Sequence, residues 1–197
     1  FLLSALGAAV IWASYSKLDA SGFRAYLEAS GQSLPDSVSD EQVLGWTRVS
    51  SVVAAAIFAP LTYLAVAGIW LGLARMAGGS LDFRRSLAVT VHGFLPFAVA
   101  AVVGLAMATF RTEITMEEIE AGALVPSHLG ILFGSAGVGK VGLALLTSVD
   151  LVSVWCIALL ALGYATVAGL SKRSAFAVVA SVWALGILIK VVLAALR

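Results

Sequence analysis

Six polar or aromatic residues lie within or beside long apolar stretches, where ionisable and hydrogen-bonding side chains are rare and are often kept for function. These candidate site residues are Asp150, Ser153, Trp155, Tyr164, Lys190 and His92. An acid and a base that face each other in lipid could carry an ion or a proton, or could pair and hold two helices together. Structural pairing is the simpler of these two interpretations, and we favour it.

Asp150 and Lys190 are predicted to lie at a similar depth, because they flank the basic hinge Ser171-Lys172-Arg173 at similar distances along the chain. Folding the chain antiparallel about this hinge brings them to within roughly two helical turns of each other in depth. The Lys190 ammonium would then extend on its aliphatic stem toward Asp150. We expect an ion pair, although the charge of Asp150 would also suit the N-terminus of a helix.

Ser153 and Tyr164 follow Asp150 at helical spacing, so the three residues are expected to share one face of a helix. Tyr164 and His92, which lies on the preceding apolar stretch, would both be about two turns from the same membrane surface. This placement predicts a hydrogen bond between Tyr164 and His92. We favour a satisfied contact between helices over a titrating site, with a proton path as the alternative.

Two other clusters have simpler explanations than ligand binding. Residues 134–140 (GSAGVGK) match the first seven positions of a phosphate-binding loop, but Val141 occupies the place of the Ser or Thr that binds magnesium. Glu117 and Glu120 would share a helix face, and two carboxylates on one helix are typical of a solvated surface. The sequence therefore predicts no nucleotide cofactor and no metal site.

Catalytic nucleophiles are also missing from the pattern. The single cysteine, Cys156, lies inside an apolar stretch, and the two histidines, His92 and His128, are expected at different depths. These residues assemble neither a Ser-His-Asp nor a Cys-His set, so the sequence predicts no catalytic residues and no enzyme.

The composition explains why apolar stretches dominate this reasoning. The chain has 197 residues, of which 61% are hydrophobic and 12% are charged, against about 45–50% and about 25% in a typical soluble domain. Its mean hydropathy is +1.03. So little charge leaves too little polar surface for a water-soluble globule, and the net charge of +1 gives no reason to expect nucleic acid as a partner. The chain is predicted to be a polytopic helical membrane protein.

The expected fold is all-α: a five-helix transmembrane bundle with short interfacial helices in the outer loops. Apolar stretches long enough to cross a bilayer core of about 30 Å, together with a first stretch that opens the chain, place spans at about 1–16, 49–74, 86–110, 150–171 and 174–196. Residues 129–147 are interrupted by glycines and Lys140, so we expect two short interfacial or re-entrant pieces there. We treat residues 1–197 as one integral membrane domain that continues N-terminally beyond Phe1.

Local signals refine this plan. Ser39 and Gln42 form a capping box that would begin the helix leading into the second span, in which Pro60 predicts a kink. Gly68 and Gly72 form a GxxxG motif, which we interpret as internal helix packing rather than dimerisation. A short helix is expected over Met116–Leu124.

Charges predict the orientation of the bundle. The 75–85 loop and the 171–173 hinge are basic, whereas the loops over 17–48 and 111–150 are acidic. Because Lys and Arg concentrate in cytoplasmic loops, the basic loops are placed inside and the acidic loops outside. The N-terminus is then cytoplasmic and the C-terminus lies outside.

One stretch carries a family resemblance. Residues 148–175, SVDLVSVWCIALLALGYATVAGLSKRSA, with Val182-Trp183 and Ile189-Lys190, resemble the Yip (Ypt/Rab-interacting protein) domain family in its bacterial form. The shared pattern is Asp, a hydrophobic pair, Ser, an aliphatic residue, Trp, and a glycine near the end of the span; Val152 replaces the usual aromatic residue. Residues 78–96, GGSLDFRRSLAVTVHGFLP, are similar to the family's loop into its third helix.

The resemblance implies a five-helix integral membrane protein with a cytosolic N-terminus, placed in the inner (plasma) membrane if the protein is bacterial. Eukaryotic relatives bind prenylated Rab-type GTPases and act in vesicle traffic. We expect a non-enzymatic scaffold or adaptor that contacts membrane lipids, binds a protein partner through its N-terminus or loops, and is a candidate homo-oligomer. The alternative is a small ion or solute channel or transporter that uses Asp150, Lys190 and His92. A continuous polar cavity would favour transport, and a dry, packed bundle would favour the adaptor.

Overall fold

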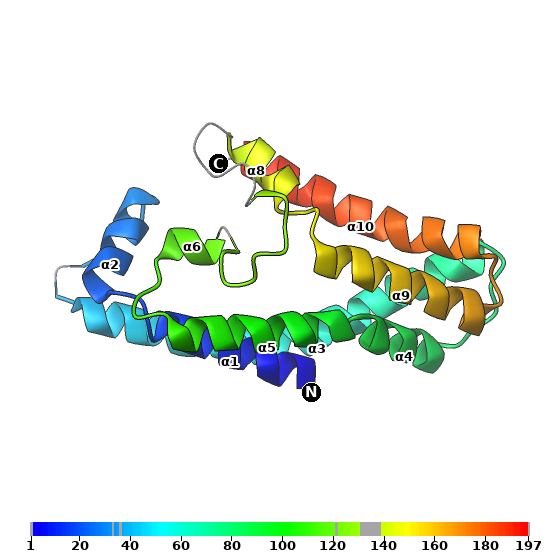
Figure 1. Ribbon diagram of the computed structural model, residues 1–197, viewed down its shortest axis with the longest axis horizontal. Coiled ribbons are helices and arrows are strands. Elements are labelled where there is room, and N and C mark those ends of the chain that lie inside the picture. The colour runs from blue at the N-terminus through cyan, green and yellow to red at the C-terminus, as the bar shows by residue number, and fades with distance from the viewer. Residues whose placement is uncertain (1, 33, 36, 121, 131–138, 197) are drawn as a thin grey trace. The chain divides into compact units, whose positions relative to one another are not determined.

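The computed structural model describes residues 2–32, 34–35, 37–120, 122–130 and 139–196, and every regular element in these ranges is an α-helix (Figure 1). An isolated backbone bridge joins His128 to Asp150. In chain order the helices are α1 (Leu2–Tyr15), α2 (Ala20–Ala29), α3 (Asp40–Met76), α4 (Phe83–Gly93), α5 (Leu95–Phe110), α6 (Met116–Glu120), α8 (Lys140–Leu146), α9 (Leu151–Ala168) and α10 (Lys172–Ala195).

Four helical stretches of the described chain are long and apolar enough to cross a membrane: Asp40–Met76, Phe83–Phe110, Leu151–Ala168 and Lys172–Ala195. This finding confirms the all-α membrane class. The count of five is not established, because α1, the expected first span, has only 14 residues. At 1.5 Å per residue α1 reaches about 21 Å, less than a typical hydrocarbon core.

Helix α3 is much longer than a membrane span. Its 37 residues extend for roughly 55 Å, so part of it must lie outside a hydrocarbon core of about 30 Å. The predicted capping box begins it: the Gln42 amide N–H donates to Ser39 Oγ at 3.3 Å, and the Ser39 N–H donates to Gln42 Oε1 at 3.2 Å. The prediction of one helix running from this box through the apolar stretch is confirmed, with Pro60 inside it.

The expected span at 86–110 consists of two helices that meet at Phe94. Pro96 lacks an amide hydrogen and is fully buried, so the helical bonding pattern cannot pass through it unchanged. The Phe94 N–H donates to the Thr90 carbonyl at 3.1 Å and ends α4, and the Phe97 N–H donates to the Phe94 carbonyl at 3.0 Å at the start of α5. At the break, the buried Phe94 ring packs against the rings of Tyr63, Trp70 and Phe97.

The turn between α9 and α10 lies two residues earlier than the charges indicated. Gly169 ends α9 in the left-handed conformation with φ of 68°, which only glycine adopts easily. Ser171 caps α10 by accepting from the Ser174 N–H at 3.1 Å. Lys172 and Arg173 are therefore in the first turn of α10 rather than in a hinge.

The chain divides into two compact units, residues 1–60 with 98–126 and residues 61–97 with 127–197. In the first unit a small core forms around Ile114, which packs with Ala108 and Leu124. The Ile114 N–H donates to the Lys17 carbonyl at 3.0 Å and joins two segments far apart in the sequence. This unit also holds α2 and α6, the water-like part of the chain.

In the second unit, α9 packs between α4 and α10, and α10 also contacts α8 (Figure 1). Glycines permit the close approach of α4 and α9. A Cβ added to Gly93 would lie 2.3 Å from Leu160 Cδ2, and one added to Gly163 would lie 2.7 Å from Val89 Cγ1. These two positions hold the helices closer than any larger residue would allow.

The GxxxG motif does not have the predicted internal role. No described heavy atom lies within 4 Å of a Cβ built on Gly68 or on Gly72, so these glycines face open space. The physical reason is that α3 packs through another face here, the one that carries the buried residues Ala67, Trp70 and Ala74.

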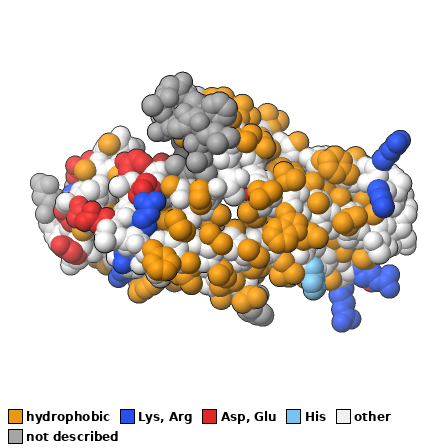
Figure 2. Space-filling model, viewed as in Figure 1, with side chains coloured by type: hydrophobic (Ala, Val, Ile, Leu, Met, Phe, Trp, Pro, Cys, Tyr) orange, Lys and Arg blue, Asp and Glu red, His pale blue; other side chains and the backbone are white. Residues whose placement is uncertain are grey.

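Large apolar side chains cover the outside of the helices, as Figure 2 shows across much of the visible face. On α3, Phe58 is 64% exposed, and on α10, Leu188 is 57% exposed. A water-soluble protein rarely exposes so continuous an apolar surface, whereas lipid tails solvate it without penalty. The exposed faces of α3 and α10 are thus suited to the bilayer interior.

Two expectations about the loops are met only in part. The expected helix at Met116–Leu124 is α6, which ends at Glu120. Of the ambiguous stretch 129–147, the described part contains the seven-residue helix α8, too short to cross a membrane. Most of the stretch that resembles a phosphate-binding loop, residues 134–138, lies outside the described residues.

We expect Gly163→Ala to lower the free energy of unfolding by about 1–3 kcal/mol, because the new methyl group would overlap the stiff, β-branched Val89 side chain. Gly68→Ala is the matched control: it makes the same change on an open helix face and should leave stability unchanged or slightly raised. Thermal unfolding of both variants in detergent micelles measures the difference. Equal melting temperatures would contradict the packing described for α4 and α9.

Candidate functional site

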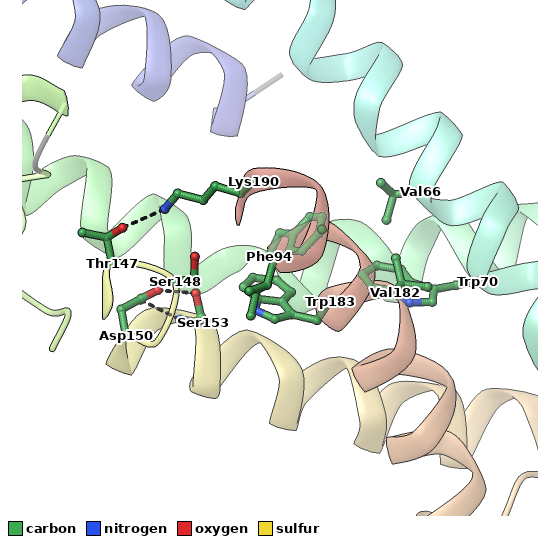
Figure 3. Close-up of a pocket in the computed structure, with 12 residues that line it drawn as sticks. Val66, Trp70, Phe94, Thr147, Ser148, Asp150, Ser153, Val182, Trp183 and Lys190 are labelled. Carbon is green, nitrogen blue, oxygen red and sulfur yellow. Dashed lines mark hydrogen bonds between the residues drawn. The ribbon is translucent and has the colours of Figure 1, made fainter. Parts of the chain in front are cut away.

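A cavity of about 400 Å³ lies within the second unit and combines a polar end with an apolar end (Figure 3). Its volume is within the usual range of about 300–1,000 Å³ for small-molecule sites. The polar end includes three of the six candidate residues, Asp150, Ser153 and Lys190. The full lining is Val66, Trp70, Phe94, Thr147, Ser148, Asp150, Ser153, Val182, Trp183, Gly186, Ile187 and Lys190.

Asp150 is the N-cap of α9. Its Oδ1 accepts from the Ser153 N–H at 2.8 Å, and its Oδ2 accepts from the Ser153 hydroxyl. The carboxylate thereby satisfies one of the free amide groups at the start of the helix, where its negative charge is also favourable. The capping interpretation of Asp150 is confirmed.

The expected ion pair between Asp150 and Lys190 is not formed. Lys190 Nζ donates instead to Thr147 Oγ1 at 2.8 Å, and none of the ion pairs found among the described residues joins it to Asp150. The reason is competition: the start of α9 holds the carboxylate, while Thr147 at the end of α8 holds the ammonium. Both charges nevertheless line the same cavity, as the depth argument required.

Tyr164 lies beyond the cavity in a closed hydrogen-bond network. Ser86 Oγ donates to the Ala67 carbonyl of α3 at 2.7 Å, so the Tyr164 hydroxyl, 2.7 Å from Ser86 Oγ, must be the donor to it. Thr90 Oγ1 is 3.3 Å from the same hydroxyl. Tyr164, Ser86 and Thr90 are all fully buried, so three helices are joined by one dry polar cluster.

The predicted hydrogen bond between Tyr164 and His92 is wrong. Ser86 and Thr90 are four residues apart on the face of α4 that meets α9, whereas His92 is two residues further on and points elsewhere. His92 is exposed, and its Nδ1 is 2.7 Å from the Ala88 carbonyl of its own helix. Spacing along the chain does not determine which helix face a residue occupies, and His92 lies on a different face of α4 from Ser86 and Thr90.

Aromatic rings close the apolar end of the cavity. The Trp70 ring centroid lies 5.8 Å from that of Phe94 and 5.9 Å from that of Tyr164. Trp70 is only 1% exposed. Trp70 and Phe94 line the cavity, whereas Tyr164, Ser86 and Thr90 do not. The two rings therefore separate the cavity from the buried hydrogen-bond cluster.

Trp155, the last candidate, lies on the outside of α9 with 48% of its surface exposed and does not line the cavity. The sequence-based reasoning missed Thr147 and Ser148, which belong to a stretch treated as interfacial, and Trp70 and Trp183, which look like ordinary apolar residues. The signal available for Thr147 and Ser148 was their position three and two residues before Asp150.

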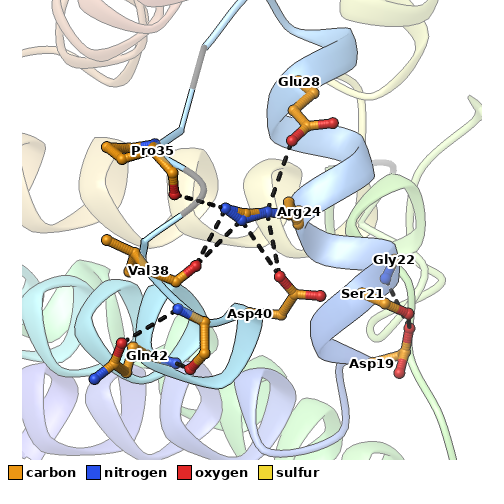
Figure 4. A network of polar contacts seen from close by, with 10 residues as sticks. Asp19, Ser21, Gly22, Arg24, Glu28, Pro35, Val38, Asp40 and Gln42 are labelled. Carbon is orange, nitrogen blue, oxygen red and sulfur yellow. Dashed lines mark hydrogen bonds and ion pairs between the residues drawn. The ribbon is translucent and has the colours of Figure 1, made fainter.

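A second polar site organises the water-like segment of the first unit, around Arg24 (Figure 4). Its guanidinium donates to the Pro35 carbonyl at 3.1 Å and to the Val38 carbonyl at 3.2 Å, and Nε lies 3.2 Å from Asp40 Oδ1. Glu28 contributes a longer ion pair at 3.7 Å. One half-buried arginine therefore ties α2, the following loop and the start of α3 together.

Around α6, the carboxylates are placed by a capping box that the sequence reading overlooked. The Thr115 N–H donates to Glu118 Oε2 at 3.0 Å, and Arg111 donates to Glu118 Oε1 at 2.8 Å. These two contacts, the backbone hydrogen bond first, lower the pKa of Glu118. Tyr26 donates to Glu120 at 2.5 Å, and this hydrogen bond raises the pKa of the Tyr26 hydroxyl.

No group of three or more His, Cys, Asp or Glu side chains that could hold a metal ion occurs within the described part of the chain. The described residues instead form two candidate binding features, one in each unit. The second unit presents an amphiphilic cavity, and the first unit presents a rigid polar surface.

Comparison with known proteins adds a family. The model of the Yip1 domain matches residues 1–193. An uncharacterized protein of Methanocaldococcus jannaschii is 28% identical over 79 residues, a match that covers 40% of this chain and 56% of that protein. The chain thus spans little more than half the length of this curated relative. No solved structure matches the chain.

We expect Tyr164→Phe to lower the free energy of unfolding by about 0.6–2 kcal/mol, because it leaves the buried Ser86 hydroxyl without its donor. Tyr63→Phe is the control, since the described residues provide no hydrogen bond to the Tyr63 hydroxyl. Both values come from thermal unfolding in detergent. A loss as large for Tyr63→Phe as for Tyr164→Phe would contradict the role assigned to the buried cluster.

The lowered pKa of Glu118 predicts an acid-sensitive segment. Its contacts with Thr115 and Arg111 stabilise the fold above the ordinary carboxyl pKa of 4.5 and are lost as the pH falls through the lowered value. Glu118→Gln should therefore speed hydrogen exchange over residues 111–120 at pH 7, and the difference from the unsubstituted chain should shrink in acid. Glu113→Gln, at an exposed site, should change exchange little. A difference that persists at low pH would count against this assignment.

Proposed function

We propose that this chain, which belongs to the Yip1 domain family, is a non-enzymatic integral membrane protein that acts as a scaffold or adaptor in membrane organisation or trafficking. One observation carries the proposal. The polar groups deepest in the second unit, Tyr164, Ser86 and Thr90, are buried and bonded to one another. These hydroxyls are satisfied by one another and by backbone carbonyls of α3 and α4, so they hold helices together, which is what a packed scaffold requires.

We further propose the topology that the charges favour. The single integral domain would cross the membrane five times, with α1 as the short first span. This topology is compatible with a homo-oligomer. The basic turns beside α4 and α10 would face the cytoplasm together with the N-terminus, and the C-terminus would lie outside. In a bacterium the membrane would be the inner one.

The adaptor surface would be the water-like segment of the first unit. Its arginines are engaged: Arg24 pairs with Asp40, Arg111 pairs with Glu118, and the Arg48 guanidinium lies 4.4 Å from the centre of the Trp12 ring. Exposed carboxylates remain, and those that take part in no ion pair and no side-chain hydrogen bond found among the described residues of this unit are Glu41, Glu113 and Glu117. This charge pattern favours a partner with a basic contact surface.

The transport alternative would need a polar path that continues from the cavity past Tyr164. It would also need His92 to join Asp150 and Lys190, but His92 is exposed on α4 and is not part of the cavity lining. The position of His92 therefore favours the adaptor over transport.

Photo-crosslinking in native membranes tests the adaptor. Thr112 is exposed and lies close in sequence to Glu113 and Glu117. A crosslinking amino acid at Thr112 should give a protein adduct of one defined mass. Charge reversal in the double variant Glu113→Lys, Glu117→Lys should reduce the adduct by about tenfold or more, because like charges then meet at the interface. The same amino acid at Leu188 on the apolar face of α10 is the matched control and should not give that adduct.

A parallel measurement of ion flux gives the contradicting result. The purified chain in proteoliposomes should not raise the permeability to protons or small cations above that of empty vesicles. A flux that Asp150→Asn abolishes, together with no adduct at Thr112, would overturn the adaptor and establish transport.

A further inference from the structure

The geometry points to a lipid-binding site: the cavity of the second unit takes one phospholipid whose headgroup carries both a phosphate and a primary ammonium, as in phosphatidylethanolamine. The headgroup would lie at the end formed by Asp150 and Lys190, and one acyl chain would lie along Trp70 and Trp183 (Figure 3). This inference is separate from the adaptor role, and each can fail without the other.

Depth places the polar end of the cavity at the level of lipid headgroups. Helix α9 has 18 residues and is about 27 Å long, close to the thickness of a hydrocarbon core. Its N-cap, Asp150, therefore lies at one membrane surface when the Gly169 turn lies at the other. Lys190 lies about 27 Å along α10 from Lys172, which brings it back to the level of Asp150.

The two charges keep unused bonding capacity. The Lys190 ammonium has three donors and gives one to Thr147, so two can reach a phosphate. The Asp150 oxygens each accept one hydrogen bond from Ser153 and retain a lone pair that an ammonium can reach. Because Asp150 and Lys190 line one cavity without forming an ion pair, they are arranged for a ligand with two opposite charges.

The other end of the cavity suits an acyl chain. Trp70, Phe94 and Trp183 supply aromatic walls, and Val182 and Ile187 supply aliphatic contact. Gly186 contributes space, since no described heavy atom lies within 4 Å of a Cβ built there. The change from charged to apolar lining follows the change from headgroup to tail in a phospholipid.

Headgroup chemistry selects among phospholipids. Phosphatidylglycerol has no cation and would leave the Asp150 carboxylate facing an anion. Phosphatidylcholine has a cation without N–H groups, so it cannot donate a hydrogen bond to Asp150. The hydroxyls of phosphatidylglycerol can donate to Asp150 but are uncharged. Only the ethanolamine headgroup, among these three, provides a cationic N–H donor for Asp150 together with a phosphate for Lys190.

Native mass spectrometry of the full chain, released from detergent with equal amounts of the three lipids, tests the site. We expect one phosphatidylethanolamine to be retained about tenfold more than either of the others, the scale of one charge-assisted hydrogen bond. Soluble phosphoethanolamine, which has the headgroup without chains, should not displace it. Equal retention of all three lipids, or displacement by phosphoethanolamine, would overturn the proposal without any variant being needed.

Variants locate the site. Asp150→Asn keeps a good helix cap and should lower retention of phosphatidylethanolamine about tenfold without lowering that of phosphatidylglycerol. Lys190→Met should lower retention of both lipids, and Gly186→Leu should abolish it by filling the cavity. Lys172→Met removes an exposed charge at the other end of α10 and is the matched control. Unchanged melting temperatures show that each variant is folded, and retention that survives Gly186→Leu in a folded chain would contradict the site.

Discussion

The packing of α3, α4 and α9 in the second unit depends on the hydrogen bonds of the Tyr164 hydroxyl. A polar group placed in lipid must find its partner inside the protein, and this one finds Ser86, which in turn reaches the backbone of α3 at Ala67. Close contact between α4 and α9 makes the geometry available, because Gly93 leaves room for Leu160 and Gly163 leaves room for Val89. The hydrogen bonds then select one register of the three helices, which apolar contacts alone would specify less sharply.

The chain is solvated by both water and lipid, and its two units stabilise their polar groups in different ways. In the first unit, charged groups are held by ion pairs and capping boxes, such as those of Arg24 and Glu118, where water remains close by. In the second unit, large apolar side chains face outward, and the buried hydroxyls of Tyr164, Ser86 and Thr90 bond to one another. Asp150, Ser153 and Lys190 line the cavity. Asp150 and Lys190 lie at the polar end of the cavity. Asp150 is bonded to Ser153 and Lys190 to Thr147, and both retain free hydrogen-bonding capacity.

Features that depend on local sequence could be predicted from it. The capping box at Ser39, the apolar helices and the capping role of Asp150 each follow from a few neighbouring residues. The common depth of Asp150 and Lys190 followed from chain length alone. The resemblance to the Yip family, carried by the run from Asp150 to Trp155, agrees with the match over residues 1–193.

Features that depend on which faces meet could not be predicted in this way. His92 and Ser86 are both polar residues on α4, and only the packing of α9 shows that Ser86 faces Tyr164. Gly68 and Gly72 have the spacing of a packing motif, yet the glycines that are packed, Gly93 and Gly163, belong to no motif. The turn lies before Lys172 because Gly169, and not the basic pair, ends α9.

The central claim is that the core beyond the cavity is dry, and the natural cysteine reports on it directly. Cys156 lies one turn along α9 from Ser153, a residue of the cavity lining, and is fully buried. We predict that a water-soluble methanethiosulfonate reagent leaves Cys156 unmodified in intact membranes and modifies it after denaturation in sodium dodecyl sulfate. Rapid modification of the folded chain would show that water passes beyond the cavity and would contradict the account.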